Sequence, residues 1–145
     1  MLDSHVHFPV INIVGGLQYL SFTRPDVAFA VHKVSKYMHI SLEPHWTTVK
    51  CILCYLKSTI SHTLLIQPST VVKLHSFSDA DWASDCDDRR SVCAFCVYLG
   101  KNLISWGCKQ QQTIARSSTK AEYKALANVA AEIQWIQSLL TDLHV

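Results

Sequence analysis

The 145-residue chain lacks any long apolar run and any strong excess of charge of one sign. No apolar stretch reaches the roughly 18 residues that cross a bilayer, so we expect no membrane contact. The formal net charge is only +2, which is too small for strong non-specific binding to nucleic acid through charge alone. The first residues carry neither the basic nor the apolar segment of a secretory signal, so we expect a cytoplasmic protein.

Internal repeats and low-complexity tracts are also absent from the sequence. Hydrophobic residues make up 49% of the chain and charged residues 17%, which argues against disordered, collagen-like and highly charged classes. The length is typical of one globular domain or of two small ones.

The first part of the chain has apolar residues at helical spacing and predicts three helices. The second helix is expected to start near Thr23, because Thr23 and Asp26 match a capping box and Pro25 suits a first turn. Residues 60–70 read as a linker or a short strand. The apolar positions of the three helices are Ile13, Leu17 and Leu20; Val27, Ala30, Val31, Val34 and Met38; and Trp46, Val49, Leu53 and Leu56.

The second part predicts three strands and then one long helix. The strands are expected over residues 71–83, 91–99 and 103–108, and the short polar turns between them favour an antiparallel meander. The helix is expected over residues 119–144 and would cover one face of the sheet, which makes the fold class α+β. Its predicted apolar stripe is Leu126, Val129, Ala130, Ile133, Ile136, Leu140 and Leu143.

Five aspartates between residues 79 and 88 form the first candidate site. Strand alternation places Asp79 and Asp81 on the same side of the sheet as Phe77, where two carboxylates repel each other unless a cation or several donors lie nearby. Mg2+ accepts such ligands. The alternative is a strand that runs into a polar turn, in which Asp87 and Asp88 pair with the two arginines that follow them.

Glu122 is the second candidate, with two interpretations. It fits a purely structural capping box with Thr119. It also lies four residues before Leu126 and so extends the core-facing stripe of the helix, where a carboxylate is costly unless a cation meets it.

The cysteine pairs Cys51–Cys54 and Cys93–Cys96 superficially form two zinc half-sites. Cys93 and Cys96 lie three positions apart in a strand and therefore point to opposite faces. The other pair lies in a helix rather than in a glycine-bearing loop, so we expect no structural zinc.

Four basic residues lie near the start of the long helix. They would contact phosphate groups beside Glu122, or they form an ordinary solvated rim, and the residues alone do not separate the two. These residues are Lys109, Arg116, Lys120 and Lys124.

Several longer motifs resemble the Pol polyprotein of copia-type LTR retrotransposons. Residues 14–20 (VGGLQYL) and 23–31 (TRPDVAFAV), with shorter matches up to residue 57, resemble the closing helices of its reverse transcriptase. Residues 77–83 (FSDADWA), 87–91 (DDRRS), 103–106 (LISW) and 117–126 (SSTKAEYKAL) resemble the ribonuclease H domain that follows.

This resemblance implies an organisation and a chemistry. Residues 1–58 would be the helical tail of a reverse transcriptase, 59–70 a linker, and 71–145 the first part of a ribonuclease H-like fold. The family hydrolyses the RNA strand of RNA–DNA hybrids with two divalent ions, Mg2+ or Mn2+. Asp79 and Glu122 match its catalytic and metal-binding carboxylates, with Asp81 as a further candidate.

The resemblance also sets limits and names partners. The family's third carboxylate lies on the next strand, after Val145, and the paired aspartates of the polymerase are absent. We therefore expect an internal piece of the polyprotein with weak or absent hydrolysis and no polymerisation. Expected partners are an RNA–DNA hybrid and the rest of the polyprotein, in the cytoplasm, a virus-like particle or the nucleus. The alternative is a non-catalytic nucleic-acid-binding or interaction protein derived from the element.

Overall fold

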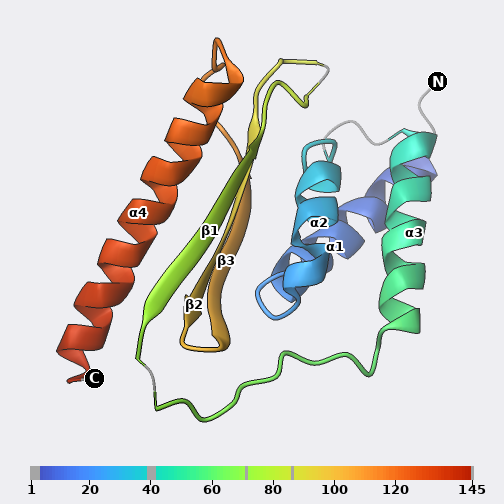
Figure 1. Ribbon diagram of the computed structural model, residues 1–145. Helices are drawn as coiled ribbons and strands as arrows, with labels where there is room; N and C mark the ends of the chain where they lie inside the picture. The colour runs from blue at the N-terminus through green and yellow to red at the C-terminus, as the bar shows by residue number, and fades with distance from the viewer. Residues whose placement is uncertain (1–3, 39–41, 71, 86, 145) are drawn as a thin grey trace. The chain divides into compact units, whose positions relative to one another are not determined.

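The computed structural model describes residues 4–38, 42–70, 72–85 and 87–144, and the chain divides into two compact units, Met1–Leu64 and Leu65–Val145 (Figure 1). The first unit is helical and the second combines a sheet with one helix, which confirms the predicted α+β class. Among the helices described, none is both long and apolar enough to span a bilayer.

The helices of the first unit pack around one core of their own. Its elements are α1 (Ser4–Leu20), the 3-10 turn η1 (Pro25–Val27), α2 (Ala28–Ser35) and α3 (Glu43–Ser58). The predicted spacing is confirmed except on α3, where Ile52 is buried and Leu53 is partly exposed. The buried residues are Val10, Val14, Leu17, Val27, Val31, Val34, Val49 and Ile52.

The predicted capping box at Thr23 and Asp26 is wrong. Nε and one terminal nitrogen of Arg24 donate to the two carboxylate oxygens of Asp26, at 2.9 and 2.7 Å. The same guanidinium donates to Oγ1 of Thr59 at 2.8 Å, and the Tyr55 hydroxyl donates to Asp26 at 2.9 Å. Asp26 therefore links the start of η1 to the end of α3 instead of capping its own helix.

The hydrogen bonds of this network perturb the titration of Asp26. Those from Arg24 outweigh the opposing effect of burial and lower the pKa of Asp26 to about 2, and the Tyr55 hydroxyl adds to this shift. The bond to Asp26 in turn raises the pKa of Tyr55. The ionised form of Asp26 is thus the one that the folded unit stabilises.

The second unit is a three-stranded antiparallel sheet with α4 (Ser118–Asp142) along one face (Figure 1). The strands β1 (Leu74–Asp81), β2 (Val92–Leu99) and β3 (Asn102–Gln110) follow each other in the sheet, which confirms the predicted meander. The β2–β3 turn contains Gly100 at φ 60°, a left-handed conformation that glycine adopts without strain.

Strand alternation assigns the two faces of the sheet. Val97 is fully buried against Val129 and Ile136 of α4, with Leu74, Phe95, Ile133 and Leu140 packed around them. The predicted stripe is wrong at Leu126, Ala130 and Leu143, which are exposed, because Ala121 and Ala125 face the sheet instead. These small side chains let the first turns of α4 approach the strands closely.

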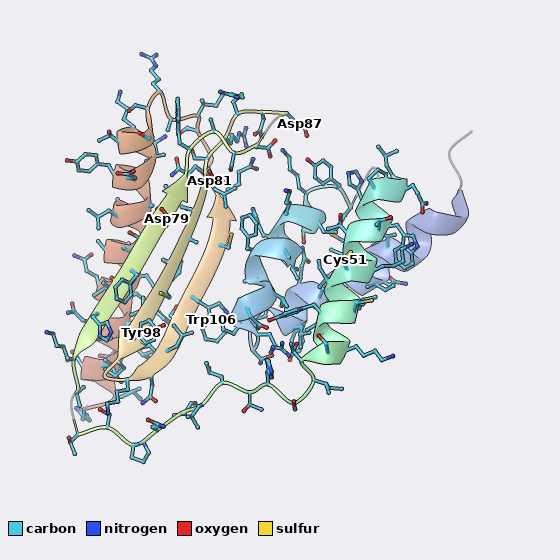
Figure 2. The ribbon with its side chains drawn as sticks, turned by 45° about the vertical axis from the view of Figure 1, so that its right-hand side comes forward. Cys51, Asp79, Asp81, Asp87, Tyr98 and Trp106 are labelled. Atoms are coloured by element: carbon cyan, nitrogen blue, oxygen red, sulfur yellow. The ribbon has the colours of Figure 1, made fainter. Side chains whose placement is uncertain are left out.

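The opposite face of the sheet carries a cluster of aromatic rings. His75 stacks on Tyr98 with ring centroids 5.2 Å apart and planes 8° from parallel. Phe77 meets both rings edge to face, at 6.0 and 6.2 Å. Figure 2 labels Tyr98 on this sheet together with Asp79 and Asp81.

Gly107 of β3 lies directly beneath the ring of Phe95, its neighbour on β2. A Cβ atom at Gly107 would lie 2.6 Å from Cε1 of that ring, which is too close for any side chain. The Phe95 ring is half-buried and packs against the core of the second unit.

We expect Asp26→Asn to destabilise the first unit by about 1 kcal/mol at neutral pH. The lowered pKa corresponds to at most about 2.5 kcal/mol, and Asp26 is 33% exposed, so solvent screens the pair. Because the folded-state pKa lies below the ordinary value, this stability is present above about pH 4 and is lost as pH falls toward 2. Hydrogen exchange of α3 amides between pH 2 and 7 measures it. Equal pH dependence in the wild type and the variant would contradict the role of Asp26.

We expect Gly107→Ala to destabilise the second unit by about 1–3 kcal/mol, because the Phe95 ring must leave its packed position. The matched control is Gly16→Ala in α1, where an added Cβ meets nothing within 4 Å. Hydrogen exchange of the β2 amides reports on the second unit. An unchanged exchange rate in Gly107→Ala would show that the ring moves freely.

Candidate functional site

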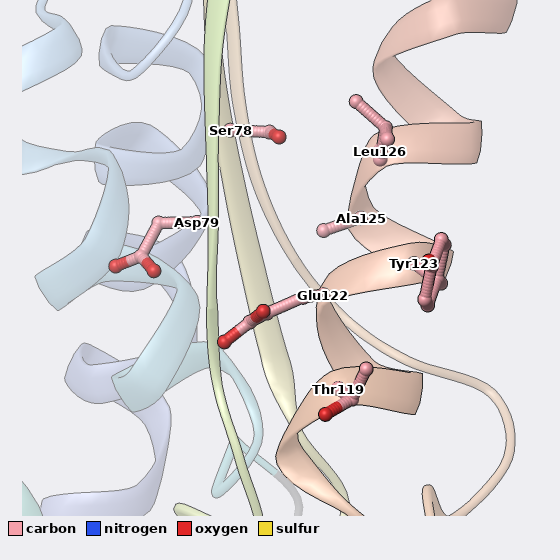
Figure 3. A pocket seen from close by; sticks show the side chains of 7 residues that line it. All are labelled: Ser78, Asp79, Thr119, Glu122, Tyr123, Ala125 and Leu126. Carbon is pink, nitrogen blue, oxygen red and sulfur yellow. The ribbon is translucent and has the colours of Figure 1, made fainter.

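A pocket of about 400 Å³ lies between β1 and the first turns of α4 (Figure 3). It brings together Asp79 and Glu122, the two carboxylates that the sequence singled out, although 43 positions separate them. The residues that line it are Ser78, Asp79, Thr119, Glu122, Tyr123, Ala125 and Leu126.

Asp79 lies near the end of β1 and is exposed. Figure 3 shows Ser78 pointing toward α4, whereas the carboxylate of Asp79 points to the other side of the strand. One of its oxygens accepts a hydrogen bond from the backbone N–H of Ala80 at 2.8 Å. The other oxygen is left available to a ligand.

Glu122 extends from α4 toward the sheet (Figure 3). The predicted capping box with Thr119 is wrong, because the helix begins earlier and Ser117 is its N-cap. The Ser117 hydroxyl accepts from the backbone N–H of Lys120 at 3.3 Å. Glu122 is therefore exposed at the pocket and not used to cap the helix.

Two side-chain hydrogen bonds fix the start of α4 and the loop before it to the sheet. Nε1 of Trp82, just after β1, donates to the carbonyl of Ala115 at 2.9 Å. Nε2 of Gln111, just after β3, donates to the carbonyl of Ala121 at 2.8 Å. Both positioning residues were missed from sequence; the only local signal is their place directly after a strand.

The two carboxylates form no ion pair with any residue that the structure describes. Hard carboxylate oxygens are the ligands that Mg2+ prefers, and one or two of them are enough when water completes the shell. The chemistry of these two donors therefore suits such an ion. Within residues 4–38, 42–70, 72–85 and 87–144, no three His, Cys, Asp or Glu side chains gather closely enough to hold a metal.

The other aspartates lie outside the pocket. Asp81 ends β1 and does not line the pocket, and Asp87 lies in the turn beyond it (Figure 2). Asp88 pairs with Arg90 at 3.4 Å, and the Gln110 side chain donates to it at 3.1 Å. The Asp88–Arg90 ion pair is one of the pairings that the structural interpretation of this cluster predicted.

The four basic candidates fall in two places. Arg116, Lys120 and Lys124 lie in or just before the first turns of α4, at the same end as Glu122. Nζ of Lys124 is held by Oγ1 of Thr113 at 2.7 Å. Lys109 lies on β3, two strands away from β1, and none of the four lines the pocket.

The cysteines that the structure describes differ in their burial. Cys51 and Cys54 are exposed on α3, whereas Cys93 is buried and its thiol donates to the Lys109 carbonyl at 3.2 Å. Burial, with a smaller contribution from Cys93, raises the pKa of Cys108 to about 11, so that thiol stays protonated at neutral pH.

Three pocket residues were not predicted from the sequence. Ser78, Thr119 and Tyr123 each place a hydroxyl-bearing side chain at the pocket. The position of Ser78 could have been predicted, because strand alternation places it on the opposite side of β1 from Asp79 and so toward the helix. Thr119 and Tyr123 could be assigned to the pocket only from the true start of α4, and the predicted capping box placed that start wrongly.

Comparison with known proteins identifies clear relatives. The chain is 49% identical over 92% of its length to the retrovirus-related Pol polyprotein from transposon RE2 of Arabidopsis thaliana. It is 37% identical over 93% of its length to the corresponding polyprotein from transposon TNT 1-94 of Nicotiana tabacum. It spans only 9% and 10% of these two proteins.

One relative has nearly the same span as the chain. Secreted RxLR effector protein 161 of Plasmopara viticola is 39% identical over 88% of this chain, and the match covers 91% of that protein. No family model and no solved structure matches the chain.

We expect Trp82→Phe to destabilise the second unit by about 1–2 kcal/mol, because the variant leaves the carbonyl of the buried Ala115 without its donor. Trp135→Phe is the matched control, since Trp135 is 60% exposed and its indole makes no such bond with a described residue. Hydrogen exchange at the start of α4 and urea unfolding measure the effect. Equal behaviour of the two variants would show that Trp82 does not anchor the loop.

Proposed function

The chain belongs to the family of copia-type transposon Pol polyproteins, and from this premise we propose that residues 71–145 are the first part of a ribonuclease H-like domain. Its substrate would be the RNA strand of an RNA–DNA hybrid. The observation that carries the proposal is that Asp79 and Glu122 line one pocket, although the first comes from β1 and the second from the helix after the third strand.

The electrostatics of the pocket support a cation between substrate and protein. Two exposed carboxylates without a basic partner would repel a phosphate group, so a polynucleotide needs a positive charge there. Asp79 and Glu122 would hold Mg2+ or Mn2+. When bound, such an ion would supply a more acidic water molecule and positive charge beside the phosphate oxygens.

The protein's own residues would then bind and orient the strand. The backbone N–H of Ala80 fixes one oxygen of Asp79, and the anchor at Ala121 holds the neighbouring Glu122 at the sheet. Arg116 and Lys120 lie at the same end of α4 and would contact phosphates on either side of the pocket.

We expect slow hydrolysis from this chain alone. The described residues supply two carboxylates at the pocket, whereas a two-metal site uses further ligands. The remainder of the polyprotein would be the partner that supplies them.

The second candidate function is nucleic-acid binding without hydrolysis. It is favoured by the basic residues Arg116, Lys120 and Lys124, which lie in or just before the first turns of α4. The basic residues at the start of α4 would then carry the binding, and it would weaken steeply as salt rises.

We expect Asp79→Asn and Glu122→Gln each to reduce cleavage of a labelled RNA–DNA hybrid by at least about 100-fold, since even outer-shell partners of a metal contribute 10–100-fold. Initial rates in Mg2+ and in Mn2+ measure this, and circular dichroism verifies folding. Asp142→Asn at the end of α4 is the control and should keep the wild-type rate.

The outcomes separate the two functions. Cleavage that persists in both site variants would contradict the proposed site. Salt-sensitive hybrid binding without cleavage, unchanged in Asp79→Asn, would establish the binding protein instead.

A further inference from the structure

The outer edge of β1 has no strand beside it in the part of the chain that the structure describes. The sheet order is β1, β2, β3, so β1 pairs with β2 on one side only. Natural edge strands are often protected by a proline, a lysine or a bulge. Residues 74–81 (LHSFSDAD) contain neither proline nor lysine and pair with β2 without a register shift. This edge is therefore open to a further strand.

The backbone hydrogen bonds show which groups of β1 point to the open edge. The carbonyl of Lys73, directly before the strand, accepts from the N–H of Gly100 on the β2 side at 2.9 Å. Because these groups alternate in direction, odd-numbered residues of β1 bond to β2 and even-numbered residues point outward. The N–H of Ala80 agrees with this assignment, since it donates to the Asp79 side chain. An added antiparallel strand must therefore bond with the even-numbered residues.

The side chains along this edge have opposite chemical character at its two ends. Lys73 and His75, which can donate hydrogen bonds, lie at the beginning, and Asp79 and Asp81 lie at the end. All four are exposed and odd-numbered, so they share with Phe77 the face of the sheet opposite to α4. Such a strand is complementary to a copy of itself that runs in the opposite direction, because opposite charges then face each other across the strands.

One antiparallel register of two copies pairs both acids with both donors. Even-numbered residues must face even-numbered residues, so Phe77 can face Phe77 of the second copy. In this register His75 faces Asp79 and Lys73 faces Asp81, and each pair occurs twice by symmetry. A shift of two residues in either direction leaves one acid and one donor unpaired. The pattern of side chains therefore selects the register that is centred on Phe77.

The position of α4 leaves room for the second copy. One flank of the helix is directed toward β3, where Glu132 accepts from Ser105 at 2.7 Å. Leu126, on the other flank, lines the pocket with Ser78 of β1 and is 55% exposed. Because α4 contacts both β1 and β2, the two helices would lie about two strand spacings apart, roughly 10 Å, which is a normal distance for packed helices. Leu126 would then be covered by the helix of the second copy.

We propose that two copies of this chain associate through β1, so that their three-stranded sheets form one continuous antiparallel sheet. The N–H of Ala80 would donate to the Leu74 carbonyl of the second copy, and the Asp79 carboxylate would turn to His75 of that copy. The other edge strand, β3, carries Lys109 as its single charge and offers no such pairing. This interaction surface is independent of the proposed function, because it needs neither a metal nor a nucleic acid.

The test is the oligomeric state of the full chain and of two matched charge variants, measured by sedimentation velocity. Lys73→Asp places two acids opposite each other at each end of the paired strands, and Asp81→Lys places two lysines there. An equal mixture of the two variants restores both opposite-charge pairs. Lys57→Asp and Glu43→Lys, at exposed positions on α3 of the first unit, are the controls, and circular dichroism verifies folding.

We expect the wild type to form a dimer and each β1 variant to raise its dissociation constant at least about tenfold, because two attractive pairs become repulsive. The mixture should associate as a heterodimer with a dissociation constant within about threefold of the wild-type value. Recovery in the mixture shows that both variants are folded, which loss of association alone would not show.

A disulfide cross-link tests the register directly. Facing residues in antiparallel strands have Cα atoms about 4.5–5.5 Å apart, which is within the range of a disulfide. Mild oxidation of Phe77→Cys should therefore link two copies through residue 77, identified by mass spectrometry of the linked peptide. His75→Cys is the control, because the two residues 75 would lie four positions apart along the sheet, roughly 13 Å.

Three outcomes would overturn the inference. A wild type that stays monomeric at millimolar concentration would show that the edge of β1 does not pair with itself and is left to a strand of another protein. A dimer that both charge variants retain would place the interface elsewhere. Two folded variants that remain monomeric when mixed would contradict the pairing of residue 73 with residue 81.

Discussion

The candidate site depends on the two hydrogen bonds that hold α4 and its leading loop to the sheet. The loop from β3 to the helix contributes little apolar burial, so its position rests on the Trp82 indole and the Gln111 amide. The amide is almost entirely buried and bonds directly to the residue before Glu122. A buried hydrogen bond of this kind is costly to break. It therefore fixes the position of Glu122, the next residue on α4, relative to the sheet.

This constraint has an electrostatic consequence. The fold brings two negative groups to one pocket and provides no basic side chain to neutralise them among the described residues. The carboxylate of Asp26 in the first unit differs, because it accepts hydrogen bonds from Arg24 and Tyr55. The chain thus contains one satisfied carboxylate that stabilises a fold and two unsatisfied ones that are exposed to ligands.

The choice of Asp79 and Glu122 rested on the resemblance to the copia-type family and stays a prediction. The sequence was sufficient for the order of elements and the antiparallel pairing. Periodicity determined these, because helix and strand spacing depend on local pattern. Periodicity failed where small side chains, or residues distant in the sequence, determine the structure. Ala121 and Ala125 take the buried side of α4 that Leu126 was expected to hold, since closeness to the sheet favours small side chains there.

Both capping boxes failed for a related reason. Ser117 and Thr119 are equally good caps by type, and only the path of the preceding loop decides between them. Asp26 matched the local pattern, but its partner Tyr55 lies 29 positions away and no local rule includes it. Ser78 and Tyr123 were not selected from the sequence, because they line a pocket that forms only in the folded structure.

The stacked rings on the other face of the sheet give this site a spectroscopic reporter of its own. His75 and Tyr98 lie nearly parallel at 5.2 Å, so each ring stands in the magnetic anisotropy of the other. Phe77 touches both and lies two positions from Asp79 on the same side of β1. A shift of β1 on occupation of the site would therefore change the proton resonances of these rings, without any label or substitution.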